Sequence, residues 1–267
     1  MGTWDETPID INLIDKKLVI NSMFIFNVKR DGTHKSRLVS RGDQQKQGTY
    51  KTDMVANTVH QNALMTCLSN CLSNGYRIIQ LDISPAYLYA DIDETLYVRA
   101  PPHMKMKDTV FQLRKSLYGL KPSGANWYNL IKSYLVQTVG RREMLGWPCV
   151  FTKRSDNAIL IIYLFVDDMI LFTNSTNLST DAMEQLKSRF QTKIINDGSN
   201  SPNNKYDILG MEINYTMNKS LKFGMQKSLE EKLLTLGINL SPLRKVPGTP
   251  GMIIEKDNSE FSDEEYL

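Results

Sequence analysis

The chain has 267 residues, of which 41% are hydrophobic and 23% are charged, a composition typical of soluble globular proteins. No apolar run approaches the ~20 residues that a membrane-spanning helix needs. The first ten residues have neither the basic flank nor the apolar core of a signal peptide, so we expect an intracellular protein. Three cysteines, an odd number, argue against a disulfide framework and indicate buried, reduced thiols.

The net charge of +3 is unevenly spread along the chain. Residues 101–155 hold ten Lys and Arg against two acidic residues, whereas residues 252–267 hold six acidic residues against one lysine. The basic middle favours a polyanionic partner, and the acidic tail is typical of a solvated segment.

In the first half, two alternating segments predict strands joined by a turn at Asp31 and Gly32. The apolar spacing that ends at Gly75 predicts a helix, and "RIIQLDI" predicts a short buried strand. A second helix has Ser123 as its expected cap and Gly140 as its expected end. The expected ranges are strands at 19–29, 35–40 and 77–83, and helices at 56–75 and 123–140.

In the second half, "AILIIYLFVDDMILF" predicts two strands that meet at Asp167 and Asp168. A helix is expected at 180–192, followed by a hairpin that alternates from Leu209 to Tyr215. Ser228 and Glu231 form a capping box that predicts a short helix ending at Gly237. The element order ββαβαββαββα implies an α+β fold with a mainly antiparallel sheet.

The two adjacent aspartates carry the chemical signal. Burying an unpaired carboxylate costs several kcal/mol, on the order of the transfer penalty out of water. At a hairpin turn they would stand at the sheet rim, where a divalent cation makes close carboxylates favourable, and hard oxygen ligands select Mg²⁺ or Mn²⁺.

Asp82 supplies another carboxylate at the end of a buried strand. Taken alone it reads equally well as a turn or helix cap. Together with Asp167 and Asp168, it completes a ligand set suited to two-metal phosphoryl transfer.

Five segments occur in the order and spacing of a known family. They are "KRDGTHKSRLVSRGD", "QLDISPAYLYADIDETLYVRAPPHM", "KSLYGLKPSGANWY", "YLFVDDMILF" and "YDILGMEINY". Together they resemble the reverse transcriptase of Ty/copia-type long-terminal-repeat retrotransposons, from about residue 19 to about residue 251. The similarity suggests a fragment of a Pol polyprotein.

The resemblance implies a right-hand polymerase with fingers and palm, the palm carrying a mainly antiparallel sheet with helices on one face. We expect a lead-in at 1–18, fingers at 19–75 and a palm at 76–220 with a finger insertion around 101–155. The end of the primer-grip hairpin and the start of the thumb would occupy 221–240, and an acidic tail 241–267.

The resemblance also assigns roles to individual residues. Asp82, Asp167 and Asp168 would be the catalytic, metal-binding carboxylates for two Mg²⁺ ions, with Mn²⁺ as a substitute, and Tyr87 would select deoxynucleotides; packing is the alternative role of that ring. The other expected nucleotide contacts are Ile83, through its carbonyl, Ser84, Ala86, Lys29, Arg30, Lys35 and Arg37, and the expected primer and template contacts are Gly210, Met211, Lys121 and Gly119.

Two prolines depart from the family pattern in the expected nucleotide pocket. Pro85 offers no amide to a triphosphate, and one hydrogen bond to a charged group is worth roughly 1.5–3 kcal/mol. Pro122 replaces a glutamine and also restricts Lys121 to extended conformations.

The implied function is an RNA- and DNA-directed DNA polymerase acting on an RNA template, a DNA primer and dNTPs in cytoplasmic virus-like particles, its DNA product passing to the nucleus. The chain ends soon after the first thumb-like helix, so we expect weak binding of primer and template without the thumb and RNase H segments of Pol. The alternatives are a truncated, catalytically impaired relic and, more remotely, another palm-like enzyme such as a nucleotide cyclase or a plain Ca²⁺-binding module.

Overall fold

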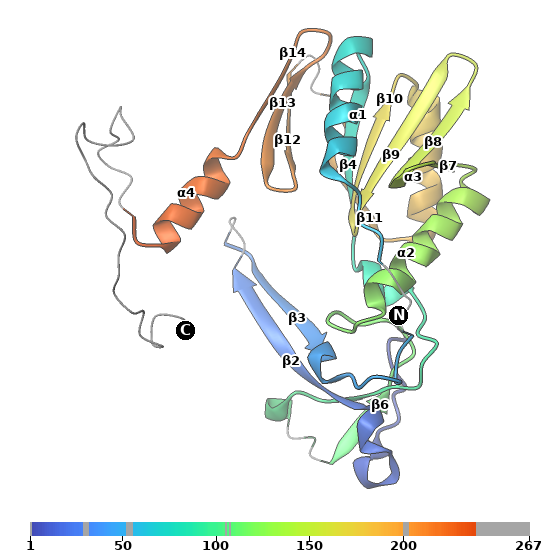
Figure 1. Cartoon of the computed structure of the whole chain (residues 1–267), viewed down its shortest axis with the longest axis vertical. Helices are drawn as coiled ribbons and strands as arrows, with labels where there is room; N and C mark the ends of the chain where they lie inside the picture. Colours follow the sequence, from blue (N-terminus) through green and yellow to red (C-terminus); the bar gives the residue numbers. More distant parts are fainter. Residues whose placement is uncertain are drawn as a thin grey trace. The chain divides into compact units, whose positions relative to one another are not determined.

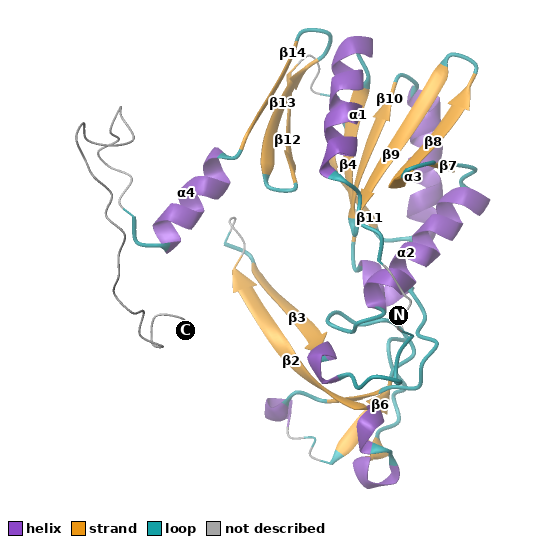
Figure 2. Cartoon of the chain, viewed as in Figure 1, coloured by secondary structure: helices purple, strands orange, loops and turns teal. Residues whose placement is uncertain are grey.

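A computed structural model describes residues 2–28, 32–51, 56–104, 106, 108–199 and 203–238 (Figure 1). It contains three β-sheets and the helices α1 to α4 (Figure 2). The chain divides into two compact units, Met1–Tyr206 with Ile213–Phe223, and Asp207–Glu212 with the residues from Gly224 on. The domain boundaries expected from the sequence stay a prediction.

A five-stranded sheet contains the predicted N-terminal hairpin. β2 (Val19–Val28) and β3 (His34–Ser40) pair antiparallel, which confirms these two strands, and β3 lies at the sheet edge. The apolar core of this sheet includes Ile20, Val98 and Leu113. The remaining strands, in sheet order, are β1 (Ile9–Asp10), β6 (Thr109–Gln112) and β5 (Tyr97–Arg99), which pairs with β2 in parallel.

A six-stranded sheet, antiparallel throughout, contains the candidate carboxylates. Together with the helices, it confirms the α+β class and the mainly antiparallel sheet. The sequence prediction omitted three of its strands, β7, β8 and β11. In sheet order the strands are β11 (Thr192–Asn196), β4 (Arg77–Ile83), β10 (Asp168–Thr173), β9 (Ala158–Phe165), β8 (Trp147–Ser155) and β7 (Arg142–Met144).

The long apolar strands β4, β9 and β10 form the centre of the sheet because their side chains are buried along most of their length. Helix α1 (Gln61–Asn74) packs on β10, and α3 (Thr176–Arg189) packs on β9 and β10. Helix α1 ends at Gly75, which has φ of 64° and confirms the predicted end. Helix α1 begins at residue 61, later than the predicted residue 56.

Two further predicted helix starts and one predicted cap were wrong. Helix α2 (Ser123–Ser133), which continues as a π-helix (Tyr134–Thr138), begins after Pro122, and the Ser123 hydroxyl donates 2.7 Å to Leu117 O instead of capping. Ser175 caps α3, its Oγ accepting from Leu178 N, and the chain leaves this helix at Phe190 to enter β11. Helix α4 (Gln226–Thr235) starts before Ser228, so that serine lies inside it.

The third sheet, with strands β12 (Asn203–Ile208), β13 (Met211–Thr216) and β14 (Ser220–Gly224), contains the predicted hairpin. The sequence prediction omitted β12. The hydroxyl of Tyr215 donates to Tyr76 O at 2.8 Å and lies 3.1 Å from Cys71 O, and Tyr206 Oη donates to Ile78 O at 2.9 Å. Two buried tyrosines therefore anchor this sheet to the junction of α1 and β4.

Candidate active site

Asp82 and Asp168 occupy facing positions on neighbouring strands. Strands β4 and β10 pair with each other, and in this pairing Asp82 on β4 lies opposite Asp168 on β10. Directly opposed residues of an antiparallel pair point to the same face, with their Cβ atoms about 5 Å apart. The strand pairing thus brings two carboxylates that are far apart in the sequence to the same end of two central strands.

The turn between β9 and β10 places Asp167 beside this pair. Val166 has φ of 55°, and its carbonyl accepts a 2.7 Å hydrogen bond from Nε1 of Trp127 on α2. The Ile83 N–H, at the end of β4, donates to the main-chain oxygen of Asp167 at 2.9 Å. The turn is therefore held from two sides, by the helix and by the neighbouring strand.

The pKa of Asp167 is shifted by the charged groups that surround it. Burial raises the pKa of this half-buried carboxyl, and the Asp82 carboxylate raises it further, whereas the cations of Lys35 and Arg37 lower it. Two carboxylates and two β3 cations thus interact at one place. Such a site favours a ligand that carries both a cation and negative oxygens.

Two tyrosines line the same place. The rings of Tyr87, in the short 3-10 helix Ala86–Tyr89, and Tyr118 lie 4.8 Å apart between centroids. Burial raises the pKa of both phenols, and the charge of Asp167 raises it further. Both hydroxyls consequently stay protonated at neutral pH and remain able to donate a hydrogen bond.

A cavity of about 330 Å³ opens between β3 and the end of β4. We call it the nucleotide cavity, after the nucleotide contacts that the sequence predicts for its lining residues Lys35, Arg37 and Ser84. This volume lies within the range of small-molecule sites, ≈ 300–1,000 Å³. Its walls include Lys35, Arg37, Ser84, Pro85, Tyr118 and Gln191.

Ile83, Ser84 and Ala86 belong to the turn in which the sequence predicts triphosphate contacts. Ser84 Oγ donates to Asp82 Oδ2 at 2.7 Å, and its N–H donates to Gln191 O at 3.2 Å. The side chains of Ile83 and Ala86 are buried, with 0% and 1% exposed. Any contact that these two residues make with a ligand must therefore come from the main chain.

The cations predicted on the finger hairpin fall into two groups. Lys35 and Arg37 line the nucleotide cavity, as described above. Lys29 and Arg30 lie outside the described residues. The roles of all four stay a prediction.

Gly119 lies against the end of β3, and Lys121 bonds to the segment that follows β3. Gly119 has φ of 90°, and a Cβ there would lie 2.1 Å from Ser40 O. The Lys121 Nζ donates to Gln45 O at 3.0 Å and to the hydroxyl of Tyr50 at 3.1 Å. Both residues hold two backbone segments together, and their contact with a template stays a prediction.

Gly210 and Met211 belong to the second unit and are described by themselves. Leu209 and Gly210 have φ of 53° and 77° and form the two-residue turn between β12 and β13. Positive φ at both positions is typical of a type I′ hairpin turn. Met211 is buried at the start of β13, and a primer contact for either Gly210 or Met211 stays a prediction.

The two unusual prolines both stand directly before a helix. Pro85 precedes the 3-10 helix, where its carbonyl accepts from Leu88 N, and Pro122 precedes α2, where its carbonyl accepts from Asn126 N. A helix start has no intrahelical acceptor for its first N–H groups. The helix starts therefore accommodate both prolines without an unpaired N–H group.

Three residues that shape the candidate site were not assigned to it by the sequence prediction. Tyr118 belongs to the quoted "SLYGLK" segment, Trp127 read only as a buried helix residue, and Gln191 follows α3 with no distinguishing motif. Tyr118 had a usable signal, because it lies within a recognised motif. Trp127 also lies within the quoted "KSLYGLKPSGANWY" segment, whereas Gln191 had no signal, because the fold alone brings it to the site.

The carboxylates of Asp82 and Asp167 are suited to a hard cation whose remaining ligands are substrate phosphates and waters. Within the described ranges, no three His, Cys, Asp or Glu side chains are grouped to hold an ion unaided. Mg²⁺ is commonly bound by one or two carboxylates together with substrate phosphates and waters. Asp82 and Asp167, whose carboxylates lie close enough for Asp82 to raise the pKa of Asp167, fit that mode.

The three cysteines are buried and unpaired, as predicted. Burial raises the pKa of the Cys67 thiol to about 11 and that of Cys149 to about 12. Within the part of the chain that is described, no helix is long and apolar enough to cross a membrane.

Residues 6–225 match the family model described as reverse transcriptase (RNA-dependent DNA polymerase). The chain belongs to this reverse transcriptase family. It is 54% identical over 270 aligned residues to the truncated transposon Ty1-A Gag-Pol polyprotein of Saccharomyces cerevisiae, covering all of this chain and 22% of that protein. The same identity relates it to the transposon Ty1-DR4 Gag-Pol polyprotein of that organism, of which it covers 17%. This reverse transcriptase family member thus spans about a fifth of its curated relatives, consistent with a Pol fragment.

Solved reverse transcriptase and telomerase structures are more distant. A foamy viral protease–reverse transcriptase in complex with double-stranded DNA matches 79% of this chain and 32% of its own, with 12% identity and a TM-score of 0.45. The apo telomerase of Candida tropicalis, truncated from its C-terminal domain, matches 76% of this chain and 55% of its own, with 13% identity and a TM-score of 0.44.

Proposed function

We propose that this chain is the catalytic core of an RNA- and DNA-directed DNA polymerase, which adds dNTPs to a primer 3′-hydroxyl. The observation that carries the proposal is the convergence of Asp82, Asp167 and Asp168 at one sheet edge, beside a cavity lined by Lys35 and Arg37. In the reaction the 3′-oxygen bonds to the α-phosphorus, and the bond to pyrophosphate breaks.

We propose that Asp82, Asp167 and the Ile83 carbonyl hold Mg²⁺, with Asp168 at the facing position. When bound, the two ions would lower the pKa of the 3′-hydroxyl and neutralise charge on the departing pyrophosphate. The raised pKa of Asp167 supports this assignment, because a carboxylate with a destabilised charge gains most from a cation.

The other residues of the site would bind and orient the nucleotide. Lys35 and Arg37 supply positive charge for the triphosphate from β3 of the hairpin, and charge-assisted hydrogen bonds are about twice as strong as neutral ones. Tyr87 and Tyr118 present two adjacent phenol rings on the sugar side. The Ser84 hydroxyl, which bonds to Asp82, holds that carboxylate in position.

The test is Mg²⁺-dependent extension of a DNA primer on an RNA template at low salt, using the full chain. We expect extension by the parent and loss of at least ~100-fold in Asp168→Asn, the scale of removing a preorganised charge from an active site. Asp156→Asn, in the exposed turn between β8 and β9, is the matched control and should extend as the parent does.

The double reversion Pro85→Ser with Pro122→Gln separates an active polymerase from a relic. Activity in the reversion but not in the parent would make the prolines the lesion and support the relic. If neither the parent nor the double reversion extends the primer, the proposal is contradicted for this fragment.

A further inference from the structure

Lys193 on β11 lies opposite the proposed metal ligand Asp82. In the pairing of β11 with β4, Lys193 is the partner of Asp82, and Thr192 is the partner of Ile83. Because β4 lies between β11 and β10, Lys193 and Asp168 flank Asp82 on its two sides. Directly opposed residues of antiparallel strands point to the same face. The register therefore places a lysine in the same row of side chains as two of the three candidate carboxylates.

The segment that carries Lys193 begins at the wall of the nucleotide cavity. Gln191, directly before β11, lines this cavity, and its carbonyl accepts a 3.2 Å hydrogen bond from Ser84 N. Lys193 is two residues further along the chain, and its ammonium group stands on a flexible four-carbon stem. Lys193 is thus close both to the cavity wall and to Asp82.

The fold makes no ion pair with the charge of Lys193. The residue is exposed, and within the described part of the chain no carboxylate pairs with its ammonium group. The facing Asp82 instead accepts a 2.7 Å hydrogen bond from Ser84 Oγ, although opposite charges at facing strand positions attract each other. The ammonium group of Lys193 can therefore turn to a ligand without breaking a contact of the fold.

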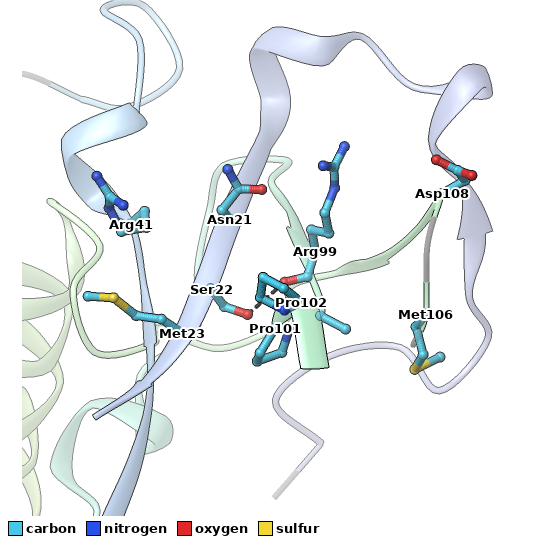
Figure 3. A pocket seen from close by; sticks show the side chains of 10 residues that line it. Asn21, Ser22, Met23, Arg41, Arg99, Pro101, Pro102, Met106 and Asp108 are labelled. Atoms are coloured by element: carbon cyan, nitrogen blue, oxygen red, sulfur yellow. Dashed lines mark hydrogen bonds between the residues drawn. The ribbon is translucent and has the colours of Figure 1, made fainter. Parts of the chain in front are cut away.

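Other cations near the site belong to a different sheet. Lys35 and Arg37 line the nucleotide cavity from β3. Arg41 and Arg99 line a cavity of about 580 Å³, drawn in Figure 3, and no described lining residue of that cavity is shared with the nucleotide cavity. Lys193 differs from both groups, because it belongs to the sheet that carries the carboxylates.

We infer that Lys193 contacts the pyrophosphate that leaves the dNTP and stabilises the charge that develops on it. In this step the primer 3′-oxygen bonds to the α-phosphorus and its proton passes to solvent. The bond from that phosphorus to the bridging oxygen breaks, and the electron pair of this bond stays on the pyrophosphate. A fixed positive charge where negative charge develops lowers the barrier, and Lys193 needs no proton transfer to supply it.

Two observations favour the leaving group over a strand phosphate as the partner of Lys193. The lysine faces Asp82, where a bound metal ion would bring the phosphates of the nucleotide, and it follows a residue that lines the nucleotide cavity. The inference rests on the proposed function, because it takes Asp82 as a metal ligand and the cavity as the nucleotide site.

The first measurement is binding without turnover. Isothermal titration calorimetry records the binding of inorganic pyrophosphate, with excess Mg²⁺, to the full chain in the absence of primer, template and dNTP. Lys193→Gln should weaken this binding about tenfold, the loss of one hydrogen bond between charged groups. Lys193→Arg should retain most of the affinity, because it keeps the charge. Lys187→Gln, which removes an exposed lysine from α3, is the matched control and should bind as the parent does.

The second measurement identifies the group that Lys193 contacts. Primer extension compares dNTPs whose β,γ-bridging oxygen is replaced by CH₂ or by CF₂, which makes the leaving group less basic. The more basic leaving group depends more on a stabilising cation, so Lys193→Gln should slow the CH₂ substrate more than the CF₂ substrate. A lysine that only balanced the charge of Asp82 would slow both equally. Single-stranded RNA binding, measured by fluorescence anisotropy, should stay unchanged in Lys193→Gln.

Three results would overturn the inference. They are pyrophosphate binding that is absent in the parent or equal in the parent and Lys193→Gln, equal slowing of both dNTP analogues, and a parallel loss of RNA binding, which would place Lys193 on a nucleic acid strand. If the parent binds pyrophosphate but extends no primer, the proposed polymerase activity fails, while the binding comparison still tests the contact of Lys193 with pyrophosphate.

Discussion

At the scale of single residues, Asp167 is held in a place that disfavours its charge. Burial and the neighbouring Asp82 both raise its pKa above the ordinary value of 3.8. A carboxyl whose pKa is higher in the folded than in the unfolded chain stabilises the fold below the unfolded pKa, and this contribution is lost as the pH rises through the folded pKa. At neutral pH the ionised Asp167 therefore lowers the free energy of unfolding.

This linkage predicts that Asp167→Asn is more stable than the parent at pH 7, and that the difference disappears below the unfolded pKa of about 3.8. Added Mg²⁺ should raise the unfolding temperature of the parent more than that of the variant, because only the parent keeps the full donor set. Thermal unfolding followed by circular dichroism between acid and neutral pH measures both effects. A variant less stable than the parent at pH 7 would refute the argument, and Asp156→Asn controls for charge removal alone.

At the scale of elements, the "LYGLK" segment crosses the end of β3 at close backbone range. Ser40 N donates to Tyr118 O at 2.8 Å. A Cβ on Gly42 would lie 1.9 Å from Gly119 O, and a Cβ on Gly119 would lie 2.1 Å from Ser40 O. Glycine is required on both sides of this crossing, which joins the finger hairpin to the cavity wall at Tyr118.

We predict that Gly119→Ala lowers the free energy of unfolding by about 3 kcal/mol, because a backbone clash adds to the cost of positive φ. Gly146→Ala is the matched control. Gly146 has φ of 77° but nothing within 4 Å of the added Cβ, so its loss should be only about 1 kcal/mol. Urea unfolding of both variants gives the comparison, and equal losses would show that the crossing has room for a methyl group.

At the scale of the whole molecule, positive charge is concentrated in the middle of the chain and at the nucleotide cavity. Residues 101–155 hold ten Lys and Arg against two acidic residues, and Lys35 and Arg37 line the cavity. Neutralising phosphates releases counterions, so binding of a single strand should weaken as salt rises.

We predict a linear fall of log K with log salt, with a slope of about −0.7 for each phosphate contacted. Arg37→Gln should reduce the magnitude of the slope by about one such step, and Arg154→Gln on β8 should leave it unchanged. Anisotropy titrations across a salt series measure the slopes. Binding that did not depend on salt would contradict the electrostatic account.

The sequence by itself determined the local elements around the site. Two strands meeting at Asp167 and Asp168, the strand that ends near Asp82 and the helix end at Gly75 were all confirmed. Each depends on short-range physics: the burial period of a strand, β-branched composition or a residue free to adopt positive φ. The family motifs added the association of these elements with a polymerase.

Only the tertiary structure decided which distant residues share the site. The facing of Asp82 and Asp168 follows from strand register, Gln191 comes from the end of α3, and Trp4 comes from the N-terminal segment, where it forms a β-bridge with Leu113. Helix starts at Ser175 and Gln226 also escaped prediction, because several residues near each start could cap a helix and packing selects among them. Pairing between segments far apart in the chain has no local signature, because its free energy comes from contacts that exist only once the chain has folded.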